Sequence, residues 1–216
     1  MIKYEHDPKL IQKISIASIR ETLALNNPDD AKQQLLIRMI LAYGDSQILP
    51  DTRISDGAIE AGLLALKRNA NVLCDSRMVV EGLKQEYLKK EPICMIDRPN
   101  VISQAKSKKL TRAMVSVENW KRFAEGSIIL IGNEATALLR LMELIELKEI
   151  NKPALIIGMP RGYIGATEAK QYLWENTLQW GVPCITMQGT RGGSTLTAAA
   201  MNGLIYLHKK LLLSHQ

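Results

Sequence analysis

The sequence predicts an α/β fold with a mainly parallel sheet of about five strands and helices on both faces. Two observations support this prediction. Short, β-prone apolar runs alternate with helix-like segments along the second half of the chain, as in βαβ units. Three of these runs are followed directly by a glycine-bearing segment and then by a helical pattern, which is typical of the carboxyl edge of a parallel sheet.

The predicted strands are short and separated by predicted helices. The three runs before the glycine segments cover 127–130, 154–157 and 183–187, and helices are expected over 135–147, 166–174 and 196–204. Two further strands are expected over 71–75, which ends at Asp75, and over 92–96. Because consecutive parallel strands need crossover connections, the intervening helices are expected to cover both faces of the sheet.

The first third of the chain is predicted to be largely helical. Apolar residues recur near a 3.6-residue period over 8–25, and further helices are expected over 31–42 and 54–69. No internal repeat and no long linker divides the sequence. We therefore expect one domain over 1–216, with an N-terminal helix within 1–25 and a basic C-terminal tail over 205–216.

Composition limits the classes of function. The net charge of +6 and the pI near 9.2 favour an anionic partner. Aromatic content is 5% and no nucleic-acid-binding motif occurs, so a small polyanion is expected rather than nucleic acid. No apolar run reaches the roughly 18 residues that span a bilayer, and the start lacks a signal-peptide pattern, so no membrane contact and a cytoplasmic location are expected.

Histidine and cysteine usage argues against several kinds of catalytic site. The histidines are His6, His208 and His215, and each is remote in sequence from the glycine segments. A catalytic triad or a histidine metal site is therefore not expected. Gly-x-Gly-x-x-Gly and P-loop patterns are absent, so no nucleotide cofactor is expected either. Cys74, Cys94 and Cys184 lack a pairing or zinc pattern, which predicts buried free thiols.

Charged residues near the strand ends are the candidates for ligand binding. Arg161 and Arg191 each lie in a glycine segment, where each could grip a carboxylate, unless one of them only packs at the rim. Asp75 could bind ligand or, more commonly, cap the helix that follows. Arg112 follows Thr111 at a predicted helix start, which favours anion binding over the alternative of a solvent-facing arginine.

In their order and spacing, these segments resemble the precorrin-8X methylmutases, also called cobalt-precorrin-8 methylmutases, of corrin biosynthesis. The resemblance runs from Asp7-Pro8 to Asn202-Gly203-Leu204. It is carried by Ser15, Arg38-Met39-Ile40, Gly44-Asp45, Asp75 with Met78-Val79, Thr111-Arg112, Ile131-Gly132-Asn133, Gly158 with Pro160, Gly162 and Gly165, Glu168 with Lys170, and Arg191-Gly192-Gly193-Ser194.

The resemblance implies a cofactor-free isomerase that moves a methyl group from C-11 to C-12 of a corrinoid macrocycle with many carboxylates. Its product would be hydrogenobyrinate or, with cobalt, cobyrinate. It also implies a homodimer with the active site near the dimer interface. The substrate contacts expected from matching positions and from the glycine segments are Ser15, Arg38, Asp75, Thr111, Arg112, Gly132, Asn133, Gly162, Arg191, Gly192, Gly193 and Ser194, with no metal.

The sequence departs from the family pattern at the proton donor. The family has Arg-Met-Ile-His-Ala, and its histidine protonates the ring system, whereas Leu41 occupies that position here. General acid catalysis contributes about 100- to 10,000-fold, so the loss is costly without necessarily abolishing turnover. One hypothesis is a working methylmutase with another donor: Tyr43, provided that the helix ends before it, or less favourably Asp45. The other is a catalytically impaired corrinoid-binding or carrier protein.

Two lesser departures lie at the same predicted edge. Glu134-Ala135 replaces the usual Ala-Pro of the family, and Arg161 replaces a small apolar residue. Since one change adds an acid and the other a base, we expect the two side chains to pair with each other rather than with a ligand.

Overall fold

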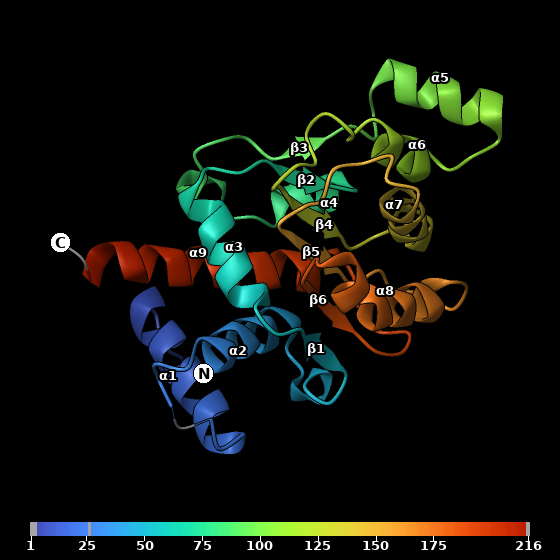
Figure 1. Cartoon of the computed structure of the whole chain (residues 1–216). Helices are drawn as coiled ribbons and strands as arrows, with labels where there is room; N and C mark the ends of the chain where they lie inside the picture. Colours follow the sequence, from blue (N-terminus) through green and yellow to red (C-terminus); the bar gives the residue numbers. More distant parts are fainter. Residues whose placement is uncertain (1–3, 26, 215–216) are drawn as a thin grey trace.

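A computed structural model describes residues 4–25 and 27–214 and contains one six-stranded sheet with helices on both faces (Figure 1). The strand order is β1-β6-β5-β4-β2-β3. The strands are β1 (Thr52–Ile54), β2 (Val72–Cys74), β3 (Ile93–Cys94), β4 (Ile128–Ile131), β5 (Leu155–Gly158) and β6 (Cys184–Met187). Strands β2 to β6 are mutually parallel, which confirms the predicted fold class and all five expected strands.

The sixth strand, β1, was not predicted. It runs antiparallel to β6 at the edge of the sheet, with Thr52 opposite Met187 and Ile54 opposite Ile185. It has three residues and shows no alternation of apolar and polar side chains that would mark it in the sequence. Its pairing with β6 therefore depends on tertiary contacts rather than on local preference.

Alternate residues of the central strands face two separate cores. Ile128 and Leu130 of β4 belong to the core beneath α9, whereas Ile129 and Ile131 belong to the core beneath α7. The first core is covered by α2 (Ala31–Tyr43), α3 (Ala58–Lys67), α4 (Arg77–Glu81) and α9 (Ser194–Ser214). The second is covered by α5 (Pro99–Lys108), α6 (Arg112–Glu118), α7 (Ala135–Glu146) and α8 (Ala166–Trp180). Burial on both faces explains why these strands are continuously apolar.

Helix α9 is longer than the sequence suggested. The predicted helix over 196–204 continues without a break to Ser214, through most of the segment that was expected to be a basic tail. Ile205 and Leu207 are buried, so the apolar face that packs on the sheet extends beyond Leu204. The helix also contacts α2 closely, since a Cβ at Gly203 would lie 3.2 Å from the side chain of Leu35.

Helix α1 (Pro8–Thr22) lies at the margin of the first core, against which its partly buried Ile19 packs. Asp7 caps it by accepting a hydrogen bond from the amide of Lys9, and Pro8 occupies its first turn. It packs against α2 and has no buried residue. Figure 1 places it beside the C-terminal half of α9.

The cysteines and the longest helices can also be compared with the predictions from the sequence. Cys74, Cys94 and Cys184 are buried and free, as predicted. Within 4–25 and 27–214, no helix is both long enough and apolar enough to cross a membrane.

Candidate active site at the carboxyl edge of the sheet

Asp75, at the end of β2, connects two neighbouring strand ends. Its Oδ2 accepts hydrogen bonds from the amide nitrogens of Asn133 at 2.7 Å and Glu134 at 3.1 Å, which follow β4. The side chain is completely buried. The expected capping role belongs instead to Ser76, whose hydroxyl accepts a hydrogen bond from the amide of Val79 in α4. Asp75 therefore holds the loop after β4 rather than the helix after β2.

Burial sets the ionisation of Asp75. Removal from water raises the pKa of its carboxyl, and the backbone hydrogen bonds from Asn133 and Glu134 oppose that rise only in part. Its Oδ1 has no hydrogen-bond partner among the described residues. A buried carboxylate oxygen without a partner favours the protonated acid. Asp75 is thus a structural acid beneath the edge, and it does not line the cavity above it.

Two glycines allow the strand ends to approach α9 and each other. A Cβ at Gly132 would lie 2.8 Å from the Cα of Ser194, so the end of β4 touches the start of α9. A Cβ at Gly192 would lie 2.3 Å from the carbonyl oxygen of Met159, and the φ of Gly192 is +150°. Side chains are sterically excluded at both positions. The two glycines therefore allow the close packing of the strand ends and loops at this edge.

Backbone hydrogen bonds join the loops after β5 and β6. The amide of Gly193 donates to the carbonyl of Met159 at 2.7 Å, and the amide of Gly162 donates to the carbonyl of Thr190 at 3.1 Å. The ends of β2, β4, β5 and β6 are therefore cross-linked into one surface. The loop after β2, which carries an acid, and the glycine-containing loops after β4, β5 and β6 are far apart in the sequence but meet here.

A cavity of about 260 Å³ opens on this surface. It is lined by Ala42, Tyr43, Met78, Asn133, Arg161, Gly192, Gly193, Ser194 and Thr195. The first turn of α9 contributes Ser194 and Thr195, and the amides at a helix start lack acceptors within the helix. Together with the guanidinium of Arg161, they give the cavity the character of an anion site.

The two arginines of the glycine segments have different surroundings. Arg161 lines the cavity. Among the ion pairs of the described chain, none joins it to Glu134, whose Oε1 accepts a hydrogen bond from the side-chain amide of Asn133 at 3.3 Å. Arg191 is held by Asp51 at 2.9 Å and by the carbonyl of Gln47 at 2.8 Å. Arg161 is thus the cavity's cation, and the expected pair between Glu134 and Arg161 does not form.

Thr111 and Arg112 lie further along the same edge. The hydroxyl of Thr111 is 3.0 Å from that of Thr136, in the first turn of α7, and it also caps α6. The Nη1 of Arg112 is 3.2 Å from Oδ1 of Asp97, and both side chains are about half exposed. Arg112 therefore remains accessible to an anion. Binding an anion would replace its surface ion pair with Asp97, which is weak in water.

Helix α2 ends at this cavity. It runs through Tyr43 and stops at Gly44, which has a φ of +78°. The helix thus includes Tyr43 rather than ending before it, yet Tyr43 lines the cavity together with Ala42. Leu41 is half-buried and is not among the lining residues. Asp45 uses its carboxylate to cap the short 3-10 helix Ser46–Ile48 through the amide of Gln47.

Two expected substrate contacts lie elsewhere in the chain. Ser15 is in α1, and its hydroxyl donates to the carbonyl of Ile11. The guanidinium carbon of Arg38 lies 3.4 Å from the ring centre of Tyr206 on α9, and burial lowers the pKa of Arg38. Neither residue lines the cavity at the strand ends. A single chain therefore does not bring Ser15 and Arg38 together with Arg161 and Tyr43.

Lys170, named above only with Glu168 as part of the family resemblance, supports the loop after β6. It is 1% exposed, and its Nζ donates a hydrogen bond to the carbonyl of Arg191. Burial lowers the pKa of Lys170 to about 8. The spacing of the apolar residues contained the signal, because Ala166, Ala169 and Leu173 place position 170 on the buried face of α8.

Comparisons with known proteins agree on one family. The family model described as Precorrin-8X methylmutase matches residues 10–207. The chain is 39% identical to a precorrin-8X methylmutase of Pseudomonas aeruginosa over 94% of this chain and 98% of that protein. It is 34% identical to a cobalt-precorrin-8 methylmutase of Leptospira interrogans over 93% and 94% of the two chains. The crystal structure of a precorrin-8X methylmutase from Thermus thermophilus superposes with a TM-score of 0.83 at 34% identity, covering 94% of this chain and 97% of that one.

Proposed function

The chain belongs to the precorrin-8X methylmutase family, an isomerase family of cobalamin biosynthesis, and we propose that it isomerises precorrin-8X or its cobalt form with the hydroxyl of Tyr43 as proton donor. The observation that supports this donor is the cavity at the carboxyl edge. Tyr43 lines it beside Arg161 and the first turn of α9, and Leu41 does not. A phenol is protonated at neutral pH and so starts in the form that can donate.

The proposed reaction needs no redox partner. The O–H of Tyr43 donates its proton to the ring system. The bond between the methyl carbon and C-11 then breaks, and a bond between the methyl carbon and C-12 forms. Since substrate and product are isomers, the same proton returns to the phenolate when the ring is released. Arg161 and the amide end of α9 hold an acid side chain of the macrocycle, while Thr111 and Arg112 hold another further along the edge.

The cavity is small for this substrate. At about 260 Å³ it lies below the range of typical small-ligand pockets, so a macrocycle with acid side chains can insert only one margin into it. The rest of the ring lies across the open sheet edge and requires a second wall. We therefore propose that a homodimer provides that wall, as the resemblance implies.

Exposed apolar residues support this dimer. Leu10, Ile11 and Ile14 on α1 are 39%, 43% and 54% exposed, and Leu213 on α9 is 64% exposed. Gln12 and Leu213 line one crevice between the two helices, so both helices carry exposed apolar side chains in the same region of the molecule. Such areas mark protein contacts. In the proposed dimer, Ser15 of α1 reaches the active site of the partner copy.

The decisive experiment is an anaerobic spectroscopic assay with precorrin-8X. We expect conversion by the wild type, a turnover reduced about 100- to 10,000-fold in Tyr43→Phe, and binding affinity that stays within a few-fold. Tyr172→Phe is the matched control, because its hydroxyl lies on the outer side of α8 and bonds to Glu146. An unchanged rate in Tyr43→Phe would eliminate this donor. Binding by the wild type with no conversion would identify a carrier instead.

A mixing experiment tests the dimer. Ser15→Ala and Tyr43→Phe are each expected to lower activity alone. If Ser15 acts on the partner's site, a heterodimer of the two variants contains one site with both wild-type groups, so mixing should restore activity. Sedimentation velocity on Ile14→Lys, which charges the apolar area, should show a shift towards monomer. Absence of restoration from a confirmed heterodimer would contradict the shared site.

The expected compartment is the cytoplasm. Three buried free cysteines fit a reducing environment.

A further inference from the structure

A second cavity, of about 310 Å³, opens at the opposite edge of the sheet from the candidate active site. Asn69, Ala70 and Val72, at the amino end of β2, lie in its wall. Because β2 to β6 are parallel, this is the amino edge, whereas Tyr43 and Arg161 lie at the carboxyl edge. The remaining walls come from the end of α3, the segment 86–90 before β3, and the C-terminal half of α9.

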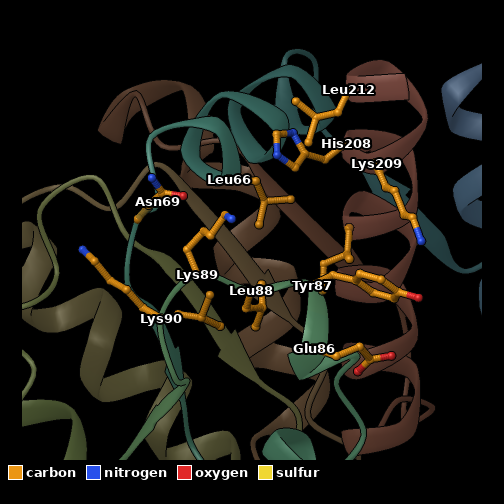
Figure 2. A pocket seen from close by; sticks show the side chains of 13 residues that line it. Leu66, Asn69, Glu86, Tyr87, Leu88, Lys89, Lys90, His208, Lys209 and Leu212 are labelled. Carbon is orange, nitrogen blue, oxygen red and sulfur yellow. The ribbon is translucent and has the colours of Figure 1, made fainter. Parts of the chain in front are cut away.

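The cavity combines an apolar floor with a basic rim. Leu66, Leu88, Ile205 and Leu212 supply apolar side chains from three separate segments. Figure 2 shows Lys89 extending towards Leu66 in the middle of the view, with His208 and Leu212 above it on α9, while Lys90 points outwards. This arrangement suits a ligand that has both an apolar body and a charged group.

The rim carries uncompensated positive charge. Lys89 and Lys90 form no ion pair or hydrogen bond with any described residue, and Lys209 lies with its Nζ 4.1 Å from the ring centre of Tyr87. Glu86 is the acid in the wall, and Figure 2 shows it at the opposite end of the cavity from His208. Burial, and then the nearby ammonium of Lys67, lower the pKa of His208. The local field is therefore positive.

We propose that this pocket binds a small amphipathic anion, with its charged head at Lys89 and its apolar body on the leucine and isoleucine floor. An anion near His208 would offset the charge of Lys67, and an apolar body would remove part of the floor from water, which is favourable. The inference does not depend on the isomerase activity, because the pocket shares no residue with the candidate active site.

The test is an NMR titration of the His208 imidazole, whose signal is identified by its absence in His208→Gln. The probes are octanoate, which has a head and a tail; inorganic phosphate, which has only charge; and octyl glucoside, which has an uncharged head. We expect octanoate to shift the signal to saturation and to raise the pKa of His208. Phosphate and octyl glucoside should each bind about tenfold or more weakly.

Matched variants locate the charge requirement. Lys89→Glu should raise the dissociation constant of octanoate about fivefold to tenfold. Lys106→Glu, a charge reversal on the exposed face of α5, should leave it unchanged. Both positions are exposed, so neither change threatens folding. No saturable shift with octanoate, equal binding of octyl glucoside, equal binding of phosphate, or equal loss in the two variants would each overturn the proposal.

Discussion

The ammonium group of Lys170, buried in α8, donates a hydrogen bond to the backbone carbonyl of Arg191 in the loop after β6. The side chain of the same arginine is held by Asp51, at the start of β1, and by the carbonyl of Gln47. Arg191 thus joins α8, the segment that follows α2, and the loop that forms the cavity floor. These contacts hold the loop that carries Gly192 and Gly193, which line the cavity.

Removing the amine of Lys170 should loosen this loop and change how stability depends on pH. The pKa of Lys170 falls to about 8 in the folded chain, from an unfolded value near 10.5. The unfolded state therefore binds more protons between these values, so stability rises as the pH increases through this window. Urea unfolding should show that the free energy of unfolding of the wild type rises relative to that of Lys170→Met between pH 7.5 and 10. A difference in unfolding free energy that stays constant over this range would contradict the lowered pKa of Lys170.

Gly192→Ala should be severely destabilising. Its Cβ would lie 2.3 Å from the carbonyl oxygen of Met159, at a φ of +150°. Backbone strain and overpacking together should cost about 3 kcal/mol or more. Gly189→Ala is the matched control, since it has a φ of +71° and nothing within 4 Å of its Cβ, and about 1 kcal/mol is expected there. Equal losses in urea unfolding would show that the close approach to Met159 is unimportant.

Much of this edge could be predicted from sequence because its parts are local. The glycine segments after β4, β5 and β6 and the acid after β2 lie where apolar runs end, and the order of a parallel fold brings such ends together. Partnerships across the sheet could not be predicted in the same way. Asp75 binds amides that are 58 and 59 residues away, and Arg191 meets Asp51 beside a strand that has no local pattern.

The orientation of the last turn of α2, which carries the proposed proton donor, could not be predicted from the sequence either. The helix was expected over 31–42, with an end before Tyr43, but it includes Tyr43 and stops at Gly44. Which side chain of its last turn meets the cavity depends on how α2 packs against α9, through contacts such as Leu35 with Gly203. That packing turns Ala42 and Tyr43 towards the cavity, which sequence spacing alone does not specify.

Asp75→Asn should remove a pH dependence of stability that is opposite in sign to that of a paired acid. Burial raises the pKa of the Asp75 carboxyl in the folded state, so its ionisation opposes folding. The penalty is absent below the ordinary pKa of about 4 and grows as the pH rises through the raised value. The uncharged amide of this variant would still offer one acceptor oxygen to the amides of Asn133 and Glu134. Relative to the variant, the wild type should therefore lose stability as the pH rises above about 4.

Asp75→Ala separates the hydrogen bonds from the charge. It removes the acceptor altogether, so two partly buried amides lose their partner at every pH, at about 0.5–1.5 kcal/mol each. Urea unfolding should then show a loss at low pH that Asp75→Asn does not show. If both variants behaved alike at pH 4, the hydrogen bonds from Asn133 and Glu134 would not be what keeps Asp75 in place.

Arg161 and Arg191 should respond differently to loss of charge. Arg161→Gln should weaken substrate binding by about tenfold, because a charge-assisted hydrogen bond to a carboxylate is lost, while unfolding is nearly unchanged. Arg191→Gln should mainly lower the free energy of unfolding, since it releases Asp51 and Gln47. Calorimetric binding and urea unfolding of both variants distinguish the roles. The opposite assignment would mean that Arg191 turns into the cavity when substrate binds.

Leu41→His tests whether position 41 can still serve as a donor position. In the Tyr43→Phe background, an added imidazolium next to Ala42 should restore part of the turnover. The restored rate should fall as the pH rises through about 6.5, because the imidazolium loses its proton, whereas the wild-type rate, supported by a phenol, should not fall there. Rescue without this pH dependence would point to a packing effect of the histidine. No rescue would mean that position 41 faces away from the ring, since Leu41 is half-buried and outside the cavity lining. The replacement of histidine would then have come with a permanent shift of the donor role to Tyr43.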